Sequence, residues 1–362
     1  MVEKIAVLGA GHGGHAASAD LTLYGFKVNL WEFPRFKENI DPIIERGGID
    51  VYGSARVGFA KLNRATTDIQ EALEDVDVII GAVIANAHRT IAELCAPHLR
   101  DGQTVMLWGK GGGTLVFSKV LRDLGVKKDI LLGEANSFPY GCRRRGPAKV
   151  EVLSPLKKGT VLVGFPAKDT GRLMDIVHEL YPDRPDFFVQ GDNVLESMMY
   201  DLNAVTHPAV TLCNAGRIEF TKGNFPHWGE GFTASVARLE AALDEERLAV
   251  VKAMGLTGVS TNKVRSSYWL KPGGLLTTVK APPTLEIRYI TEDTPCGLVT
   301  FSSIGQMLGV ETPVIDSLIT VFSALLGRDF RKKEYGARTV EELGLVGMSP
   351  EQMREYVIEG KI

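Results

Sequence analysis

The feature that most constrains this fold lies near the N-terminus, where an apolar segment runs directly into a glycine-rich turn. Residues 4–14 read KIAVLGAGHGG, with the spacing GxGxxG at Gly9, Gly11 and Gly14. In a strand–turn–helix unit, the first glycine permits the tight turn, the second lets the backbone approach a pyrophosphate, and the third allows close helix–strand packing. The N–H groups that begin the helix then face the phosphate charge. The sequence therefore predicts a dinucleotide-binding turn.

A second apolar segment ends at Glu32, which follows Gly14 by 18 positions. An acidic residue at about this spacing accepts hydrogen bonds from the adenosine ribose and repels a 2′-phosphate. Arg35 offers the alternative, because a guanidinium can receive such a phosphate or stack on adenine. We expect NAD(H) to be favoured over NADP(H), with the backbone of His12 and Gly13 completing the cofactor site.

The composition is that of an ordinary globular protein. The 362 residues are 44% hydrophobic and 23% charged, which is enough chain for two or three domains. A net charge of −3 gives no basic field, so nucleic acid is not an expected partner. The four cysteines lack CxxC spacing, which argues against a metal site or a disulfide framework. We expect the thiols to be reduced, which predicts a cytoplasmic protein. The apolar runs are far shorter than the roughly 20 residues that span a bilayer, so we expect no membrane segment.

In the first half of the chain, short β-type runs alternate with helix-type stretches, which implies a parallel sheet with crossover helices. The expected strands are residues 5–8, 28–31, 76–83, 104–108 and 130–133, and the expected helices include 87–96 and 114–124. Strand-like segments 149–153 and 160–164 and an amphipathic helix at 170–180 extend this sheet in our prediction.

From Asn193 onward, helical periodicity dominates. The expected helices are residues 194–220, 233–254, 298–308 and 314–326, followed by a short last helix with Ser349 as its N-cap and Pro350 at its first position. The predicted domains are residues 1–187, which bind the dinucleotide, and residues 188–362, a mainly α-helical substrate domain.

Three polar residues interrupt an apolar stretch of the second domain. Asn203, His207 and Asn214 stand at offsets of 4 and 11, which places them on one face of a helix. Pro208 directly follows the histidine and removes the backbone donor that would bond the carbonyl of Ala204. A structural histidine is the alternative to a catalytic one.

A second polar cluster joins a cation to two acids. Arg288 precedes Glu292 and Asp293, just before a Pro/Gly turn that begins another helix. A helix-capping segment and a chemical site are equal alternatives for this cluster on its residues alone.

Taken together, these segments resemble the octopine/nopaline (opine) dehydrogenase family, over nearly the whole chain. The motifs that fall in family order are the GAGHGG turn, the His88 segment, Gly133-Glu134, Tyr140-Gly-Cys-Arg143, Asn203-x3-His207-Pro208, Arg288-x4-Asp293, Thr312-Pro313 and Asp329-Phe330. The resemblance implies an α/β Rossmann N-terminal domain and a helical C-terminal domain like that of 6-phosphogluconate dehydrogenase, with a His/Asp pair in the cleft. It also implies reductive joining of a pyruvate-like 2-oxo acid to the amino group of an amino acid.

The residue types suit that chemistry. Histidine titrates near neutrality, so His207 can carry the protons that accompany hydride transfer to an imine. Asp293 would fix the tautomer of the imidazole and stabilise its charged form. Arg288 offers a planar fork for a substrate carboxylate, with a surface or interdomain ion pair as the alternative.

Other candidates carry weaker signals. Asn203, Asn214, Tyr140, Arg143 and His88 are candidate substrate-binding residues, and a cap or an exposed residue is the alternative for His88. We expect His12 and His15 to act through backbone position and packing, and Lys110 in the loop 109–113 to be exposed.

Two other functions remain open on the sequence. One is a reductase of a single 2-oxo acid, of the ketopantoate type, in which lysine is the usual proton donor. The other is a non-catalytic NAD-binding protein. In each case the expected partners are small molecules, and the sequence leaves the oligomeric state open, with a homodimer as one option.

Overall fold

The computed structural model describes residues 1–153, 159–258, 260–261 and 278–361. The chain forms two compact units, one comprising Met1–Met198 together with residues from Arg354 onward, and the other Met199–Met353. The division therefore falls later than the expected boundary at residue 187. The reason is that β12 (Phe188–Gln190) pairs in parallel with β11 (Thr160–Phe165), so the sheet of the first unit continues past that residue.

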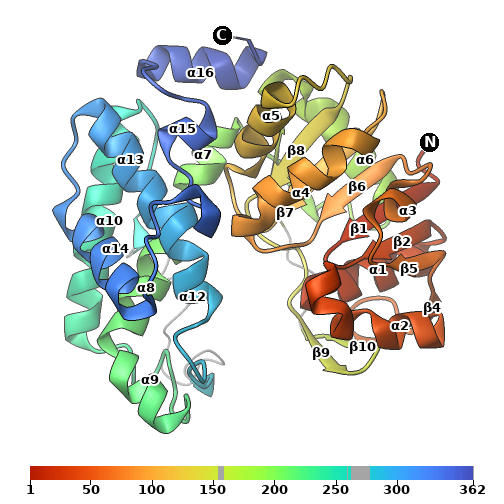
Figure 1. The fold of residues 1–362 in the computed structure, drawn as a ribbon, viewed down its shortest axis with the longest axis horizontal. Coiled ribbons are helices and arrows are strands. Elements are labelled where there is room, and N and C mark those ends of the chain that lie inside the picture. The colour runs from red at the N-terminus through yellow and green to blue at the C-terminus, as the bar shows by residue number, and fades with distance from the viewer. Residues whose placement is uncertain (154–158, 259, 262–277, 362) are drawn as a thin grey trace. The chain divides into compact units, whose positions relative to one another are not determined.

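The first unit is built on an eight-stranded sheet with the order β12-β11-β8-β7-β6-β1-β2-β5 (Figure 1). Its other strands are β1 (Lys4–Leu8), β2 (Lys27–Trp31), β5 (Arg64–Thr66), β6 (Val78–Gly81), β7 (Thr104–Trp108) and β8 (Leu131–Ala135). All neighbouring pairs are parallel except β8 and β11, which run antiparallel. The predicted α/β class is confirmed, and the sheet is mixed rather than purely parallel.

The connecting helices agree with the sequence prediction. The principal ones are α1 (His12–Tyr24), α4 (His88–Cys95), α5 (Gly113–Asp123) and α6 (Thr170–Leu180), with the shorter α2 (Asp41–Arg46) and α3 (Ile69–Leu73). They form because stretches with apolar residues at helical spacing follow β-type runs, so each helix can bury one face against the sheet.

A second, four-stranded sheet has the order β4-β3-β10-β9 and was not expected. Its strands are β3 (Gly48–Gly53), β4 (Gly58–Lys61), β9 (Cys142–Gly146) and β10 (Lys149–Val152). The prediction that residues 149–153 extend the main sheet is therefore wrong, because β10 pairs with β3 and β9 instead.

Helix α1 lies between the two sheets, in contact with β1 and β2 of the large sheet and with all four strands of the small one. Its residues 14–21 are all buried, and three of them are alanines. A helix that is covered on both sides cannot show the usual polar stripe, and small side chains let two layers approach it. The helix that begins at the glycine turn is thus packed between the small sheet and the large one.

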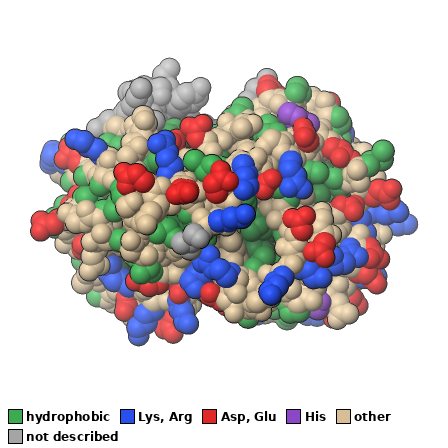
Figure 2. Space-filling view, turned by 90° about the horizontal axis from the view of Figure 1, so that it is seen from above, with side chains coloured by type: hydrophobic (Ala, Val, Ile, Leu, Met, Phe, Trp, Pro, Cys, Tyr) green, Lys and Arg blue, Asp and Glu red, His purple; other side chains and the backbone are tan. Residues whose placement is uncertain are grey.

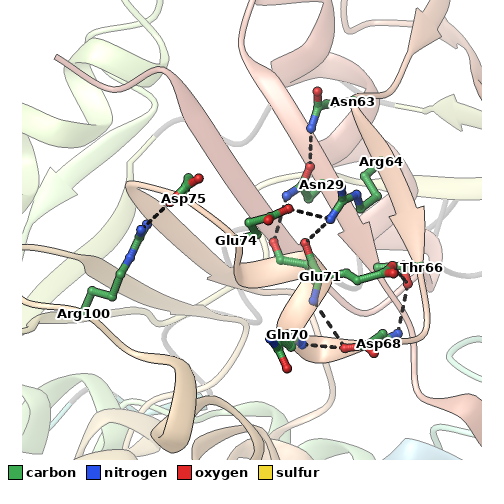
Figure 3. A network of polar contacts seen from close by, with 11 residues as sticks. Asn29, Asn63, Arg64, Thr66, Asp68, Gln70, Glu71, Glu74, Asp75 and Arg100 are labelled. Carbon is green, nitrogen blue, oxygen red and sulfur yellow. Dashed lines mark hydrogen bonds and ion pairs between the residues drawn. The ribbon is translucent and has the colours of Figure 1, made fainter.

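Side-chain hydrogen bonds hold the β5 edge of the large sheet (Figure 3). The buried Asn29 on β2 donates to the carbonyl of Ala72 at 2.9 Å and accepts from Asn63 at 2.7 Å. The guanidinium of Arg64 donates to Glu74 at 2.9 Å, and Asp68 caps α3. These bonds fix the short edge strand to the helix that follows it.

The second unit is mainly helical. Its helices are α8 (Asn203–Cys213), α9 (Ala215–Thr221), α10 (Ala234–Ala253), α12 (Arg288–Thr291), α13 (Val299–Leu308), α14 (Pro313–Leu326) and α15 (Val340–Leu343), with a π-helical turn, η6, at Thr294–Leu298. The helices expected at 233–254, 298–308 and 314–326 are confirmed to within a few residues. The last helix, α16 (Pro350–Glu359), begins as predicted, because the Gln352 N–H donates to the Ser349 hydroxyl.

The single helix expected at 194–220 is wrong. This segment contains α7 (Val194–Met199), then α8 and α9, with breaks at residues 200–202 and at Asn214. The backbone of Asn214 is non-helical, with φ −119° and ψ 12°. Its side-chain amide donates to the carbonyl of Val210, and asparagine often competes with helical hydrogen bonds in this way.

No helix in the described part of the chain combines the length and apolarity that crossing a membrane requires. Among the described residues, no group of three or more His, Cys, Asp or Glu side chains is arranged to hold a metal ion. On the face drawn in Figure 2, basic and acidic side chains lie interspersed, so neither sign forms a continuous field there.

Candidate active site

The glycine turn has the steric form that its spacing predicts. Gly9 has φ +107°, and a Cβ there would lie 2.8 Å from the carbonyl oxygen of Ala82. A Cβ at Gly14 would lie 1.6 Å from the carbonyl oxygen of Gly9, so only glycine permits this helix–strand approach. A Cβ at Gly11 would meet nothing within 4 Å. Backbone contacts within the protein thus require glycine at the first and third positions. The second glycine leaves open space beside the start of the helix.

Glu32 braces this turn. Its buried carboxylate accepts hydrogen bonds from the N–H groups of Ala10 at 3.0 Å and Phe33 at 2.8 Å, and from the Asn39 amide at 3.2 Å. Burial raises the pKa of Glu32, and these hydrogen bonds oppose that rise. A carboxylate has about four lone-pair positions, so a further donor can still bind.

Arg144, which the sequence analysis missed, lies beside the turn. Its guanidinium donates to the Asn39 side chain at 2.5 Å and approaches the Ala10 carbonyl at 3.5 Å. Side chains alternate between the faces of a strand, so on β9 Arg144 shares a face with the buried Cys142 while Arg143 is exposed. The guanidinium of Arg143, the residue predicted from the sequence, donates to the carbonyl of the neighbouring Cys142. Arg144, the next residue, is the one that reaches the glycine turn. The alternation of side chains along a strand predicts that Arg143 and Arg144 point to opposite faces. Which of them points toward the turn depends on how β9 pairs in the small sheet, and the sequence did not predict that pairing.

A cavity of about 360 Å³ opens beside this turn within the first unit. Its lining includes His12, His15, Asn39 and Arg144, so it is bordered by polar groups from α1, the segment after β2, and the small sheet. The other expected cation, Arg35, is exposed, and its guanidinium lies over the rings of Phe33 and Phe36.

The two histidines of the turn differ in burial: His15 is buried, as expected, whereas His12 is only partly covered. The His15 ring nitrogen Nδ1 lies 3.0 Å from the Gly11 carbonyl, and burial lowers the pKa of His15 to about 4. The Nδ1 atom of His12 accepts a hydrogen bond from the Arg144 N–H at 3.2 Å. Burial, followed by the charges of Arg143 and Arg144, lowers the pKa of His12. Both rings therefore favour the neutral form.

The side chain of Glu134 holds the loop at residues 109–113 through hydrogen bonds. This fully buried carboxylate accepts hydrogen bonds from the N–H groups of Gly112 and Thr114 at 2.8 and 3.0 Å, and from the hydroxyls of Thr114 and Ser197. Lys110 in this loop is only 5% exposed, so the expectation of an exposed lysine is wrong. The loop is therefore held in one conformation, because the buried Glu134 carboxylate binds two amide groups at its end.

His88 begins α4 and is fully buried, which excludes the exposed alternative. A Cβ at Gly113 would lie 2.3 Å from its Nδ1 atom, so the glycine makes room for the imidazole.

Tyr140 lies in the core of the first unit rather than on a substrate surface. Its hydroxyl donates to Asp20 at 2.9 Å and lies 2.8 Å from the hydroxyl of Tyr181. Arg184 completes the group by donating to the same aspartate. Burial, the neighbouring tyrosine and the aspartate raise the pKa of Tyr140 well above its usual value. This position favours a structural role, and we leave Tyr140 out of the proposed site.

The second polar site lies in the helical unit. The Nδ1 atom of His207, on α8, lies 2.7 Å from the Oδ2 atom of Asp293, which directly precedes the π-helical turn η6, and both side chains are buried. The two residues are 86 positions apart in sequence. A carboxylate on one ring nitrogen orients the imidazole and stabilises its protonated form, which leaves the other nitrogen for proton transfer.

A glycine contact brings the two residues together. A Cβ at Gly297, in the π-helical turn, would lie 2.3 Å from the Cβ of Ala204 on α8. Ala204 stands about one helical turn before His207, and Gly297 about one turn after Asp293. The absence of a side chain at Gly297 therefore lets the Asp293 segment approach the histidine helix. π-Helical turns often occur at functional sites.

Aromatic side chains surround the His207 ring. The ring centroid of Tyr289 lies 4.1 Å away and that of Trp228 lies 5.4 Å away. Trp228 and Tyr289 also contact His227, which is fully buried. Sequence reasoning missed all three residues: His227 and Trp228 lie in a segment without a motif, and Tyr289 occupies an unspecified position of Arg288-x4-Asp293.

Arg288 begins α12 and has a half-exposed side chain. Its guanidinium lies 3.4 Å from Glu292 and over the ring of Tyr289. Burial alone would lower the pKa of Arg288, but the carboxylates of Glu292 and Asp293 raise it overall. The group remains a cation with part of its surface uncovered.

The two predicted asparagines are not buried with His207, although Asn203 lies one helical turn before it on α8. Asn203 is exposed at the start of α8, whereas Asn214 follows the end of that helix. The Asn214 amide donates to the carbonyls of Val210 and Gly231, and thereby ties the helix end to the loop that carries Trp228. This bonding is structural.

Comparison with known proteins identifies the family. Residues 190–326 match the family described as NAD/NADP octopine/nopaline dehydrogenase, alpha-helical domain, and residues 4–129 match the NAD-dependent glycerol-3-phosphate dehydrogenase N-terminus. The chain is 35% identical to an opine dehydrogenase of Arthrobacter sp. (strain 1C), over 97% of this chain and 98% of that protein.

Two solved structures are similar in fold. The structure of an octopine dehydrogenase with NADH and L-arginine gives a TM-score of 0.75 at 21% identity, covering 99% of this chain and 98% of that one. That of yersinopine dehydrogenase with NADP⁺ bound gives 0.75 at 14% identity, covering 98% and 99%.

A Rossmann-type unit with a glycine turn, joined to a helical unit with a buried His–carboxylate pair, defines a class of NAD(P)-dependent oxidoreductases. Within this class, the chain belongs to the opine dehydrogenase family.

Proposed function

We propose that this protein is an opine dehydrogenase that reductively joins a 2-oxo acid such as pyruvate to the amino group of an amino acid, and catalyses the reverse oxidation. The observation that carries the proposal is the 2.7 Å contact between His207 and Asp293, buried in the helical unit. Its support comes from family membership and from a relative of 35% identity over nearly the full chain.

His207 is the proposed acid/base residue. Condensation and reduction require protons to move at the amine nitrogen and the carbonyl oxygen, and an imidazole exchanges protons in both directions near neutral pH. Asp293 is the positioning residue that accepts from Nδ1, so Nε2 is the atom that faces the reacting group. Enclosure by Tyr289 and Trp228 limits the water that competes for this proton.

Arg288 is the proposed carboxylate-binding group. Both substrates and the product carry carboxylates, and a guanidinium can bind one through two parallel hydrogen bonds. Its present partner, Glu292, lies at 3.4 Å and leaves half of the side chain exposed, so a substrate carboxylate can bind without breaking a buried pair.

The proposed cofactor residues are Gly9, Gly11, His12, Gly13 and Gly14 at the turn, with Glu32 and Arg35 near the adenosine end. The open space at Gly11 and the helix start at His12 fit a pyrophosphate. When bound, the reduced nicotinamide supplies the hydride.

We infer that NAD(H) is favoured over NADP(H), because the Glu32 carboxylate would repel a 2′-phosphate. Arg144 and Arg35 are the two cations that could reverse this preference. Steady-state kinetics with NADH and NADPH under identical conditions tests it, together with Glu32→Gln, which should narrow the difference between the two. A clear preference of the unaltered enzyme for NADPH would overturn the assignment to Glu32.

One assay tests the reaction itself. NADH oxidation is followed with pyruvate alone, then with pyruvate plus each member of an amino-acid panel. Oxidation that requires both components is the expected result. Oxidation with pyruvate alone would instead indicate a single-substrate reductase, and NADH binding without any turnover would indicate a binding protein.

We also infer a reducing, cytoplasmic environment for this enzyme. All four cysteines are free thiols, and three of them are buried. Disulfides are rare in reducing compartments, and free thiols are typical there. Location of the tagged protein by cell fractionation tests this inference.

A further inference from the structure

The side chain of His227 is an unusual buried group. It is 0% exposed, and neither ring nitrogen has a hydrogen-bond partner among the residues that the structure describes. A neutral imidazole presents one N–H donor and one acceptor, so two hydrogen bonds are unmade. Buried polar groups are rarely left in this state, and an exception commonly marks a functional group.

The backbone holds this histidine firmly in place. The His227 N–H donates to the Val279 carbonyl at 2.9 Å, and the Ala281 N–H donates to the Phe225 carbonyl at 2.9 Å. A Cβ at Gly231 would lie 2.3 Å from the His227 carbonyl oxygen, so the loop turns tightly against it. These backbone contacts fix the position of His227. The groups that lack hydrogen bonds are therefore only the two nitrogens of its side chain.

His227 shares its aromatic neighbours with His207. Its ring lies 5.7 Å from Tyr289, nearly parallel at 17°, and 4.9 Å from Trp228. The same two rings lie 4.1 and 5.4 Å from the His207 ring. Two histidines with common neighbours therefore lie in one aromatic cluster, although among the described residues only His207 has a carboxylate partner.

The environment of His227 disfavours a proton on it. Burial, followed by the charge of His207, lowers the pKa of His227 to about 4. The ring is neutral at physiological pH and is a weak base, so it can accept a hydrogen bond from an amine without taking its proton. It cannot supply the positive charge that a carboxylate prefers, which Arg288 can.

We propose that His227 is a substrate-binding residue that accepts a hydrogen bond from the amino group of the amino-acid substrate, beside His207. The faces of Trp228 and Tyr289 add to this preference, because aromatic rings attract cationic groups. Tyr289 is only partly buried, and side-chain rotamers commonly change on binding, so the amine approaches past this ring. The proposal rests on the opine dehydrogenase function and deepens it, since it names the group that holds the amine.

Two variants test this role. His227→Phe replaces the imidazole with an apolar ring, and His227→Gln keeps a donor and an acceptor. His178→Gln, at an exposed histidine on α6 of the other unit, is the matched control. The measurements are the melting temperature and the KM values for NADH, for pyruvate, and for the amino acid of the panel that gives the highest turnover.

Loss of one neutral hydrogen bond should raise the amino-acid KM of His227→Phe by roughly three- to tenfold. The KM values for NADH and pyruvate should not change, the melting temperature should be equal or higher, and His227→Gln should recover part of the affinity. An unchanged amino-acid KM in His227→Phe would overturn the proposal, as would a rise confined to pyruvate. If His227→Phe does not fold, His227→Leu takes its place, and an unchanged amino-acid KM in that variant would overturn the proposal. These results are separable from failure of the proposed function, in which the unaltered enzyme itself shows no amine-dependent oxidation.

Discussion

The glycine turn and the His207–Asp293 pair are built on opposite principles. The turn is local, because three glycines within six positions define its shape, and steric contacts at Gly9 and Gly14 come from the same strand–turn–helix unit or its neighbour. The acid/base pair joins residues 86 positions apart, and it depends on the contact of Gly297 with α8. A local motif can therefore be recognised from spacing alone, whereas a dyad from distant helices requires a known family pattern or a structure.

The largest expected effect separates chemistry from cofactor binding. His207→Ala should lower kcat by about 10²–10⁴, because general acid/base catalysis typically contributes that factor. The dissociation constant for NADH should change little, since the histidine lies in the helical unit and the glycine turn in the other. Turnover measurements and NADH fluorescence titration give the two quantities. Equal losses in both would mean that His207 is a structural residue.

The next effect concerns pH and compares one buried histidine of each unit. The pKa values of His15 and His227 are about 4, compared with 6.5 for an ordinary histidine. Above pH 6.5 both the folded and the unfolded states are neutral at these positions. As the pH falls from 6.5 toward 4, the unfolded state takes up protons that the folded state does not, so each residue lowers stability by up to roughly 3 kcal/mol.

Urea unfolding at pH 7 and pH 5 checks this sign. The loss of stability on acidification should be smaller in His227→Phe than in the unaltered protein, because one of the two titrating groups is gone. The remaining loss belongs in part to His15. An identical loss in both proteins would show that His227 is protonated as easily when folded as when unfolded.

A third prediction uses two glycines of one turn as a matched pair. Gly14→Ala should destabilise the first unit by about 1–3 kcal/mol and weaken NADH binding, because its Cβ would lie 1.6 Å from a backbone oxygen. Gly11→Ala has open space, so it should leave thermal stability nearly unchanged and weaken NADH binding alone. Calorimetry and NADH titration measure both. Unchanged NADH affinity in Gly11→Ala would remove the pyrophosphate role from that position.

The smallest expected effect tests the contact that forms the dyad. Gly297→Ala should reduce turnover by about tenfold, because a shift of a few tenths of an ångström to one ångström misaligns the carboxylate and the imidazole. Ala204→Gly removes the atom that Gly297→Ala would strike. The double variant should therefore recover turnover relative to Gly297→Ala, and additive losses in the two single variants would contradict the proposed contact.

Local signals determined much of this molecule. Alternating β-type and helix-type segments predicted most of the large sheet and its helices, and capping residues such as Ser349 marked helix starts correctly. These features depend on neighbours within a few positions, so they can be predicted from the chain. Spacing marked His207 and the cluster from Arg288 to Asp293 as candidates, and the family resemblance joined His207 and Asp293 as a pair before their contact was visible.

Tertiary structure decided the rest, because pairing and burial bring together residues that no local pattern connects. The small sheet takes β10 away from the large sheet and turns Arg144, rather than Arg143, toward the glycine turn. Burial moved Tyr140 into a hydrogen-bonded core and covered Lys110. The same process enclosed His227 beside His207, where its ring nitrogens lost water without gaining a partner from the described part of the chain. No sequence motif indicates this burial.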